Sequence, residues 1–198
     1  MEQLQSVTSL AVKQKKEWGE IVSGFETKNK YVVMDQLGNE LFYAVEVGGS
    51  FLLRSFLRGM RPFTMDILLS SGERVLQLRR PFRFILSHLD IYDRQGTKIG
   101  SLQQRFTILK RLYSVYGAEG QCMAQLVGPI LHPWTFHVVR NGVEVGSIKK
   151  QWSGMGKEMF TDADNFSATF PPDFDEKQKS ILLGAIFLID FVHFENRK

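Results

Sequence analysis

The 198-residue sequence has a single cysteine, Cys122, so it cannot form an internal disulfide. It also has no Ser-, Pro- or Gly-rich tract of the kind that links two domains, which predicts one domain. The opening residues, MEQLQSVTSLAVKQKK, carry Glu2 and no apolar run of signal-peptide length, so they do not indicate export. With a single thiol, these features predict a reducing, cytoplasmic environment.

Catalytic and nucleotide-binding motifs are missing as well. The four histidines show no HxH or HExxH spacing, and no GxGxxG or GxxxxGK loop occurs. The net charge of +4 favours anionic surfaces but is far from that of a nucleic-acid-binding tail, so no nucleic acid partner is expected. The sequence therefore offers no catalytic constellation, although residues distant in sequence could still meet in a folded site.

No apolar run reaches the length of a membrane span. The most apolar stretch, residues 181–194, would rise about 21 Å as a helix against a hydrocarbon core of about 30 Å, and Asp190 interrupts it. Single-pass anchoring is therefore not expected. The apolar residues nevertheless cover every side of a helix, which predicts a central helix enclosed by protein. They are Ile181, Leu182, Leu183, Ile186, Phe187, Leu188, Ile189, Phe191 and Phe194.

Turn signals are abundant. They occur at residues 35–40 (DQLGNE), 70–73 (SSGE), 93–98 (DRQGTK), 117–121 (GAEGQ) and 140–144 (RNGVE). Their flanks alternate between apolar and polar residues, the period of two expected of half-buried strands. The five hairpins account for ten strands, and residues 159–170 are expected to supply one or two more. Four of the turn glycines recur every 22 to 24 residues, which favours a closed meander.

These patterns predict a mainly β fold with α: a closed β-barrel of about twelve strands enclosing the hydrophobic C-terminal helix. A barrel of this size has room for one helix about 10 to 12 Å across. We expect a single domain, 1–198, with a peripheral N-terminal helix at 1–20, the barrel at 20–172 and the central helix at 174–195. Asp173 or Asp175 is expected to cap that helix, with Glu176 in its first turn.

Several stretches resemble the phospholipid scramblase family, which shares the tubby C-terminal-like barrel with a buried C-terminal helix. They are GFETKNKYVVMDQLGNELFYAVE at 24–46, RPFTM at 61–65, QWSG at 151–154, KEMFTDADNF at 157–166 and GAIFLIDFVHFE at 184–195. The resemblance covers nearly the whole chain. Animal members carry cysteine clusters and a proline-rich N-terminal extension that have no counterpart in this sequence, so it is similar to a minimal or prokaryotic-type member.

The resemblance implies calcium-stimulated, ATP-independent movement of phospholipids between leaflets, with a calcium segment at DADNFSATFPPD. The expected ligands are Asp162, Asp164, Asn165 and Asp173. Phe166 and Ser167 stand where an EF-hand loop has an oxygen donor and a glycine, so any affinity should be weak, about 0.1 to 1 mM. The alternative is that these residues only form a turn and caps beside a strand.

Cationic residues predict contact with an anionic phospholipid membrane surface. The candidates are Arg54, Arg58, Arg61, Arg79, Arg80, Arg83, Lys149 and Lys150, and Arg105, Lys110 and Arg111 could widen the patch. On a helix, residues 53–61 would place Leu and Phe on one side and arginines on another, as in an interfacial membrane segment. The alternative is a loop packed on the barrel with solvated arginines. Lys149 and Lys150 also align with a segment that resembles a nuclear import signal in animal relatives. Two lysines in a strand are weak evidence for such a signal.

Two functions fit the family resemblance. The first is lipid scrambling, which needs a polar path for headgroups that a helix enclosed in its own barrel does not provide. The alternative is a non-transporting peripheral module that binds or tethers phosphoinositides or phospholipids. A protein-interaction scaffold is a third possibility, and it leaves the arginines without a purpose. We expect a cytoplasmic protein peripheral to the membrane, and the sequence does not indicate an oligomeric state.

Overall fold

The computed structural model describes residues 2–14, 29–48, 60–151 and 165–194. These residues form twelve strands, a short 3-10 turn, η1 (Glu2–Leu4), and one α-helix, α2 (Glu176–His193). The strands are β1 (Ser9–Gln14), β2 (Lys30–Met34), β3 (Glu40–Val47), β4 (Phe63–Leu68), β5 (Arg74–Arg80), β6 (His88–Asp93), β7 (Lys98–Arg105), β8 (Lys110–Gly117), β9 (Cys122–Pro129), β10 (Thr135–Arg140), β11 (Val143–Gln151) and β12 (Asn165–Thr169).

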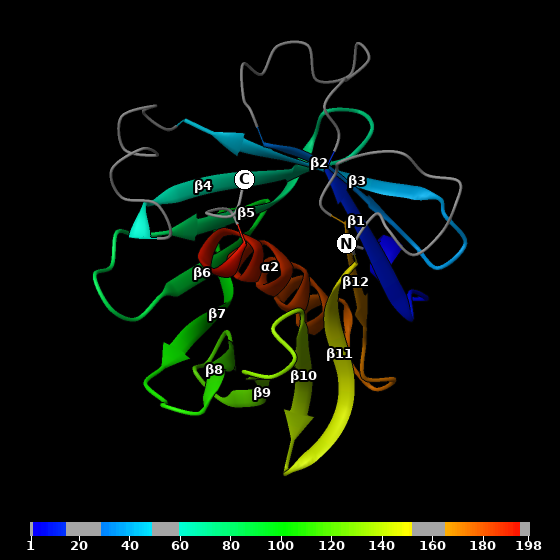
Figure 1. Cartoon of the computed structure of the whole chain (residues 1–198). Helices are drawn as coiled ribbons and strands as arrows, with labels where there is room; N and C mark the ends of the chain where they lie inside the picture. The colour runs from blue at the N-terminus through cyan, green and yellow to red at the C-terminus, as the bar shows by residue number, and fades with distance from the viewer. Residues whose placement is uncertain (1, 15–28, 49–59, 152–164, 195–198) are drawn as a thin grey trace.

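The strands close into one antiparallel barrel around α2 (Figure 1). Each strand pairs with its neighbours in sequence, and β1 pairs with β12 to complete the ring. The register holds apolar positions level with one another, because Val12 of β1 lies opposite Val33 of β2 and Phe166 of β12, and all three are buried. The predicted fold class, about twelve strands around a C-terminal helix, is confirmed.

Tight turns connect strands at one end of the barrel, and they are the five turns predicted from the sequence. Gly72 and Gly96 each have a φ of +82°, a left-handed conformation that residues with a Cβ rarely adopt. In two of the turns, Asp35 Oδ1 and Asp93 Oδ1 accept hydrogen bonds from the backbone N–H groups two and four residues further on. These short-range interactions explain why the turns could be identified from sequence.

The N-terminal segment corrects one prediction. A peripheral helix is predicted over residues 1–20, but the described part of this range, residues 2–14, forms η1 and then strand β1, which supplies the pairing that closes the barrel. Leu10 and Val12 are buried and the residues on either side of each are half-buried, so the segment follows the period of a strand. The strand pairing outweighs the weak helical pattern, because an unclosed barrel would leave two unpaired edges.

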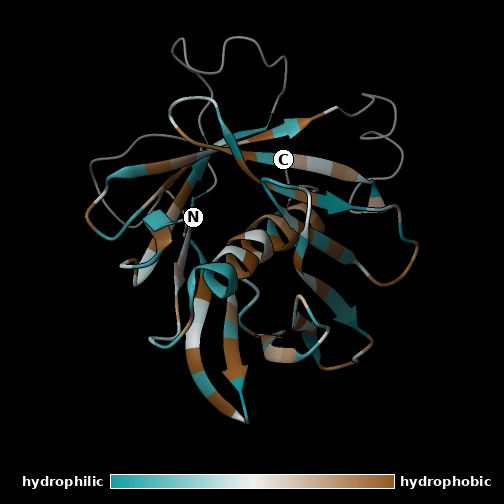
Figure 2. Cartoon of the chain, turned by 180° about the vertical axis from the view of Figure 1, so that it is seen from behind, coloured by the Kyte–Doolittle hydropathy of each residue, from teal (hydrophilic) through white to brown (hydrophobic). Residues whose placement is uncertain are grey.

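Helix α2 fills the barrel. Asp175 is its N-cap: Asp175 Oδ1 accepts the Gln178 N–H at 2.8 Å, and Gln178 Oε1 accepts the Asp175 N–H at 2.9 Å, forming a capping box. All nine apolar residues predicted to line the central helix are buried, none more than 3% exposed. Figure 2 shows α2 brown and white over most of its length, and teal mainly at its first turn. Among the described residues, no helix has the length and apolarity needed to cross a membrane.

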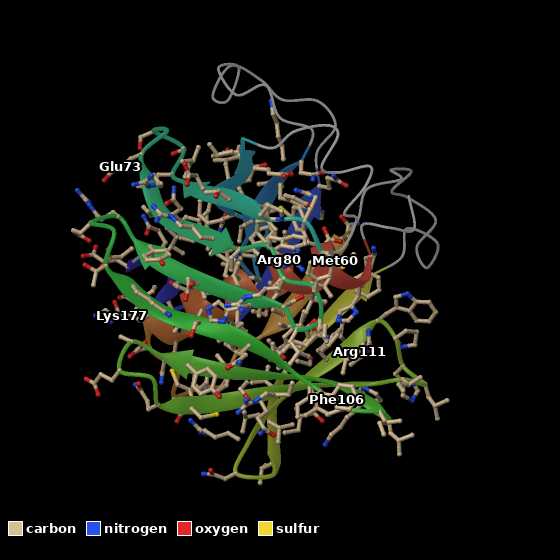
Figure 3. All side chains as sticks on the ribbon, turned by 90° about the vertical axis from the view of Figure 1, so that its left-hand side faces the viewer. Met60, Glu73, Arg80, Phe106, Arg111 and Lys177 are labelled. Atoms are coloured by element: carbon tan, nitrogen blue, oxygen red, sulfur yellow. The ribbon has the colours of Figure 1, made fainter. Side chains whose placement is uncertain are left out.

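The two ends of the barrel differ. The turn end carries the five tight turns, and α2 begins there, because β12 ends at this end. The loop end carries the connections β5–β6 (residues 81–87), β7–β8 (106–109) and β9–β10 (130–134), and α2 ends there. In Figure 3, Glu73 and Lys177 lie toward the turn end, while Met60, Phe106 and Arg111 lie toward the loop end.

Candidate functional site

The sequence predicts eight cations that contact lipid, and six of them fall within the described residues. Arg54 and Arg58 lie outside the described residues, together with most of the segment predicted to form an amphipathic helix. The structure separates the other six into buried and exposed residues, and only the exposed ones are placed to meet a lipid headgroup.

Arg61 is buried at the loop end and faces a carboxylate. Its guanidinium pairs with Glu46 through both Nη atoms, with Nη2 3.3 Å from Oε2, and the two side chains are 2% and 0% exposed. Asn29 Nδ2 also donates to Glu46 Oε2 at 2.8 Å, and Arg61 Cζ lies 4.6 Å from the centroid of the Phe191 ring. The prediction that places Arg61 on a lipid-facing surface is therefore corrected: in this structure the residue neutralises a buried Glu46 and packs on the end of α2.

Arg80 is buried as well. Its Nη1 donates to the carbonyl oxygen of Arg61, and its Nη2 donates to Ser87 Oγ at 3.0 Å. The neighbouring Arg79 is exposed, because successive side chains of a strand point to opposite faces. The expectation of two adjacent surface arginines is therefore corrected for Arg80, which lies on the inner side of β5 at the loop end.

Four predicted cations keep some exposure. Arg79 donates from Nε to Gln77 Oε1 at 2.6 Å, and Arg83 is exposed in the β5–β6 loop. Lys149 is exposed on β11, whereas Lys150 is half-buried, with its Nζ 4.4 Å from the centroid of the Phe194 ring. These residues come from different strands and do not form one compact cluster.

Three described loops of the loop end, β5–β6, β7–β8 and β9–β10, are nevertheless electropositive. The three loops, with two residues on either side of each, contain no Asp or Glu. The same segments contain Arg79, Arg80, Arg83, Arg105, Lys110 and Arg111. The turn end mixes both signs, as in the exposed pair between Arg94 and Glu73 at 2.9 Å. Loops that carry fixed cations and no carboxylates of their own attract anionic partners.

Arg111 organises one of these loops. Its guanidinium donates to the carbonyl oxygens of Pro129 at 3.2 Å, His132 at 3.3 Å and Pro133 at 2.7 Å, and its Cζ lies 4.3 Å from the Phe136 ring centroid. One fork of N–H groups thus holds the β9–β10 loop to β8. The sequence predicts that Arg111 could widen the lipid-contacting patch, but it does not indicate that this side chain crosslinks a loop.

His193 ends α2 beneath the loop end. Its Nε2 lies 2.8 Å from the Tyr113 hydroxyl oxygen. Burial, with a smaller contribution from the positive charge of Arg111, lowers the pKa of His193 to about 4, and burial raises the pKa of Tyr113. The imidazole is therefore neutral at pH 7 and serves as a hydrogen-bonded core residue.

The predicted calcium ligands do not come together within the described residues. Asp162 and Asp164 lie outside them, and Asn165 is the first residue of β12. Asp173 lies beyond the other end of this strand, which is itself about 13 Å long, and pairs with Arg140 at 2.7 and 3.0 Å. Asn165 and Asp173 therefore do not face one ion. The described residues also contain no group of three His, Cys, Asp or Glu side chains that could hold a metal.

Comparisons with known proteins now identify the fold and the family. Residues 1–196 match the sequence profile of the family named Scramblase. The chain is 36% identical to phospholipid scramblase 1 of Mus musculus over 98% of its own length and 63% of the relative. It is 34% identical to phospholipid scramblase 2 of Bos taurus, covering 98% of this chain and 71% of that one. The chain thus spans less than two thirds of the mouse relative.

A solved structure has a similar fold. An X-ray structure of a protein from Arabidopsis thaliana matches with a TM-score of 0.51 and 16% identity, covering 95% of both chains. At this identity the likeness concerns the fold alone. The sequence match over 98% of the chain carries the family assignment, and the chain belongs to the Scramblase family.

Proposed function

We propose that this chain binds anionic phospholipid bilayers through its loop end and acts there on phospholipids. The observation that carries the proposal is the charge of three described loops at this end, which contain no carboxylate and bear exposed Arg83 and Lys110. Cations near an anionic leaflet contribute about 1 kcal/mol each to binding, so a few suffice for reversible attachment. The relatives' name, phospholipid scramblase, is consistent with a phospholipid ligand.

Phospholipid translocation is the activity that the relatives' name suggests for the bound state. A second function, that of a non-transporting phosphoinositide- or phospholipid-binding module, is favoured by one observation. In the described part of the chain, the barrel interior is occupied by buried side chains of α2 and the strands, such as Phe187 and Tyr31 with ring centroids 5.2 Å apart. A filled interior offers no polar path for a headgroup, so translocation would have to occur through the bilayer around the protein.

A weak calcium site is part of the proposal, with a smaller ligand set. Asp162, Asp164 and Asn165 follow one another closely in sequence, whereas Asp173 is engaged by Arg140 beyond the far end of β12. Within the described residues, the buried Oδ1 of Asn165 accepts no hydrogen bond, which leaves an oxygen available to a cation. Calcium would bind at the loop-end start of β12 and add positive charge there.

The test uses purified protein and vesicles of defined composition. Co-flotation is measured with vesicles of phosphatidylcholine alone and with vesicles containing phosphatidylserine, each with and without calcium. Translocation is then measured in the same vesicles by dithionite quenching of a fluorescent phospholipid. Binding that requires phosphatidylserine supports the proposal. The proposal is overturned if the protein binds neither kind of vesicle. Binding without accelerated quenching assigns the chain to the non-transporting module.

The calcium arm has its own variants. The double variant Asp162→Asn with Asp164→Asn should abolish any calcium-dependent gain in binding or quenching, because each substitution removes an anionic carboxylate. Asp173→Asn, the matched control, should leave that gain intact. An equal loss in both proteins, or no calcium effect in the unchanged chain, would overturn the three-residue site.

A further inference from the structure

Large apolar side chains protrude from the three loops of the loop end. Six of them are between 76% and 89% exposed. They are Phe84 and Ile85 in the β5–β6 loop, Phe106, Ile108 and Leu109 in the β7–β8 loop, and Leu131 in the β9–β10 loop. Within the described residues, the turn end exposes only Leu37 and Val143 to a comparable extent, at 80% and 62%. Among the described residues, the apolar side chains are therefore concentrated on the same three loops that contain no Asp or Glu.

The topology brings these loops together. They join three successive pairs of antiparallel neighbours, β5–β6, β7–β8 and β9–β10, so all three emerge at the same end of the barrel wall. With strands about 4.8 Å apart, the three connections span roughly 20 to 25 Å of the rim. Apolar side chains gathered over such a span on a soluble surface mark an interaction site.

We infer that the three loops insert their apolar tips into the interfacial region of an anionic phospholipid bilayer. This inference rests on the function proposed above and gives it an orientation: the C-terminal end of α2 faces the membrane and the turn end faces water. Side chains such as Phe84, Leu109 and Leu131 would lie among the acyl chains near the headgroups. Arg83 and Lys110, adjacent to these tips in sequence, would meet the phosphates.

The loop backbone is suited to this environment. Inserting a loop removes water from its carbonyl oxygens, which is costly unless they have partners. Arg111 already binds the carbonyl oxygens of Pro129, His132 and Pro133 from the protein side. Trp134, 38% exposed at the base of the same loop, has the amphipathic ring that is enriched at membrane interfaces.

Charge and shape favour a bilayer over a protein partner. The apolar residues sit on three separate loops, and a bilayer accepts such protrusions without a matching groove. The flanking cations have no acidic residue beside them in these loops, which complements a continuous anionic surface. Binding of a protein partner instead would appear in the test below as loss of protein capture with unaltered vesicle binding.

The first experiment compares two charge-matched double variants. Leu109→Asp with Leu131→Asp places two carboxylates on the loop tips, and Leu37→Asp with Val143→Asp places two on the turn end. All four side chains are mostly exposed, so both variants should fold. We expect the loop-end variant to lose affinity for phosphatidylserine-containing vesicles by about tenfold or more, and the turn-end variant to bind like the unchanged chain.

The second experiment reports insertion directly. Cys122, the only cysteine, is exposed at the turn end and can carry an environment-sensitive fluorophore without mutation. The matched probe is Leu131→Cys in a Cys122→Ser background. On adding vesicles, the probe at position 131 should shift its emission to shorter wavelength and be quenched by spin-labelled lipid. The probe at Cys122 should do neither.

The outcomes separate the inference from the proposed function. If the chain floats with anionic vesicles but both double variants bind equally, or the probe at 131 stays in water, insertion is overturned and electrostatic binding remains. If the unchanged chain does not float, both are overturned. If the loop-end variant loses capture of a protein while vesicle binding is unaltered, the apolar loops serve a protein partner and the inference fails.

Discussion

Two arginines that the sequence predicts as lipid contacts, Arg61 and Arg83, have different roles at the loop end. Arg61 and Glu46 are a buried pair, and each compensates the desolvation of the other. Arg83 lies in an exposed loop and has solvent around it. No local signal distinguishes the two, because Glu46 and Phe191, which Arg61 contacts in its buried position, are distant in sequence. Sequence patterns therefore identified a basic region, and the structure decides which of its arginines a lipid can reach.

Replacing these two arginines separates folding from binding. Arg61→Gln should lower the free energy of unfolding by about 3 kcal/mol, because the Glu46 carboxylate stays buried with a weaker partner. Arg83→Gln should change it by less than about 0.5 kcal/mol and weaken binding to anionic vesicles. Urea unfolding followed by circular dichroism, and vesicle co-flotation, measure the two effects. An Arg61→Gln protein as stable as the unchanged chain would contradict the importance of the buried pair.

His193 gives the barrel a pH-dependent stability. Its pKa is about 4 in the folded state and near 6.5 in the unfolded chain, so the unfolded chain binds more protons between these values. This contribution is fully present above about pH 6.5 and is lost as the pH falls toward 4. His193→Gln, which keeps a neutral polar side chain, should reduce the slope near pH 5 by up to about 1.4 kcal/mol per pH unit.

The matched control for that measurement is His132→Gln, since His132 is exposed in the β9–β10 loop. Unfolding free energies are compared between pH 4.5 and 7.5. Identical slopes for the unchanged chain and the His193→Gln protein would show that His193 is not held neutral by burial.

At the scale of elements, prediction succeeded where the signal is local. The turns containing Gly72 and Gly96 depend on a few adjacent residues, and the continuous apolar surface of α2 requires enclosure. The sequence predicts a helix at strand β1, because the strand is specified by its pairing with β2 and with β12, which is more than 150 residues away, and not by its own residues. The sequence does not predict the exposed apolar loop tips, because the residues adjacent to a Leu or Phe do not indicate whether its side chain is buried or exposed in the fold.

The start of α2 offers a test of its local determinants. Asp175→Ala removes the acceptor for the Gln178 N–H and breaks the capping box, which should cost about 1 kcal/mol of stability. Asp173→Ala, two residues earlier, loses only an exposed pair with Arg140 and should have a smaller effect. Chemical unfolding of the two variants provides the comparison. Equal losses would indicate that the cap contributes nothing beyond general surface charge.

The whole molecule has a polarity that no single residue shows. Tight turns and mixed charges occupy one end of the barrel, and apolar loops with cations occupy the other. At the turn end, Lys179 ties α2 to η1, because its Nζ donates to the Leu4 and Gln5 carbonyl oxygens at 3.0 and 2.8 Å. Composition alone could predict an attraction to anionic surfaces, but the direction of approach follows from which strand connections share an end.

Reversing charge at one end at a time tests that direction. Arg83→Glu with Lys110→Glu removes two cations and adds two anions beside the loop tips. Binding to phosphatidylserine-containing vesicles should fall at least about tenfold, since each surface cation contributes about 1 kcal/mol. Arg94→Glu with Lys177→Glu makes the same change in net charge at the turn end and should have little effect. Because these contributions are screened, the difference between the two proteins should shrink as salt rises toward 0.5 M. Equal loss of binding in both proteins would mean that net charge, rather than the orientation of the barrel, governs attachment.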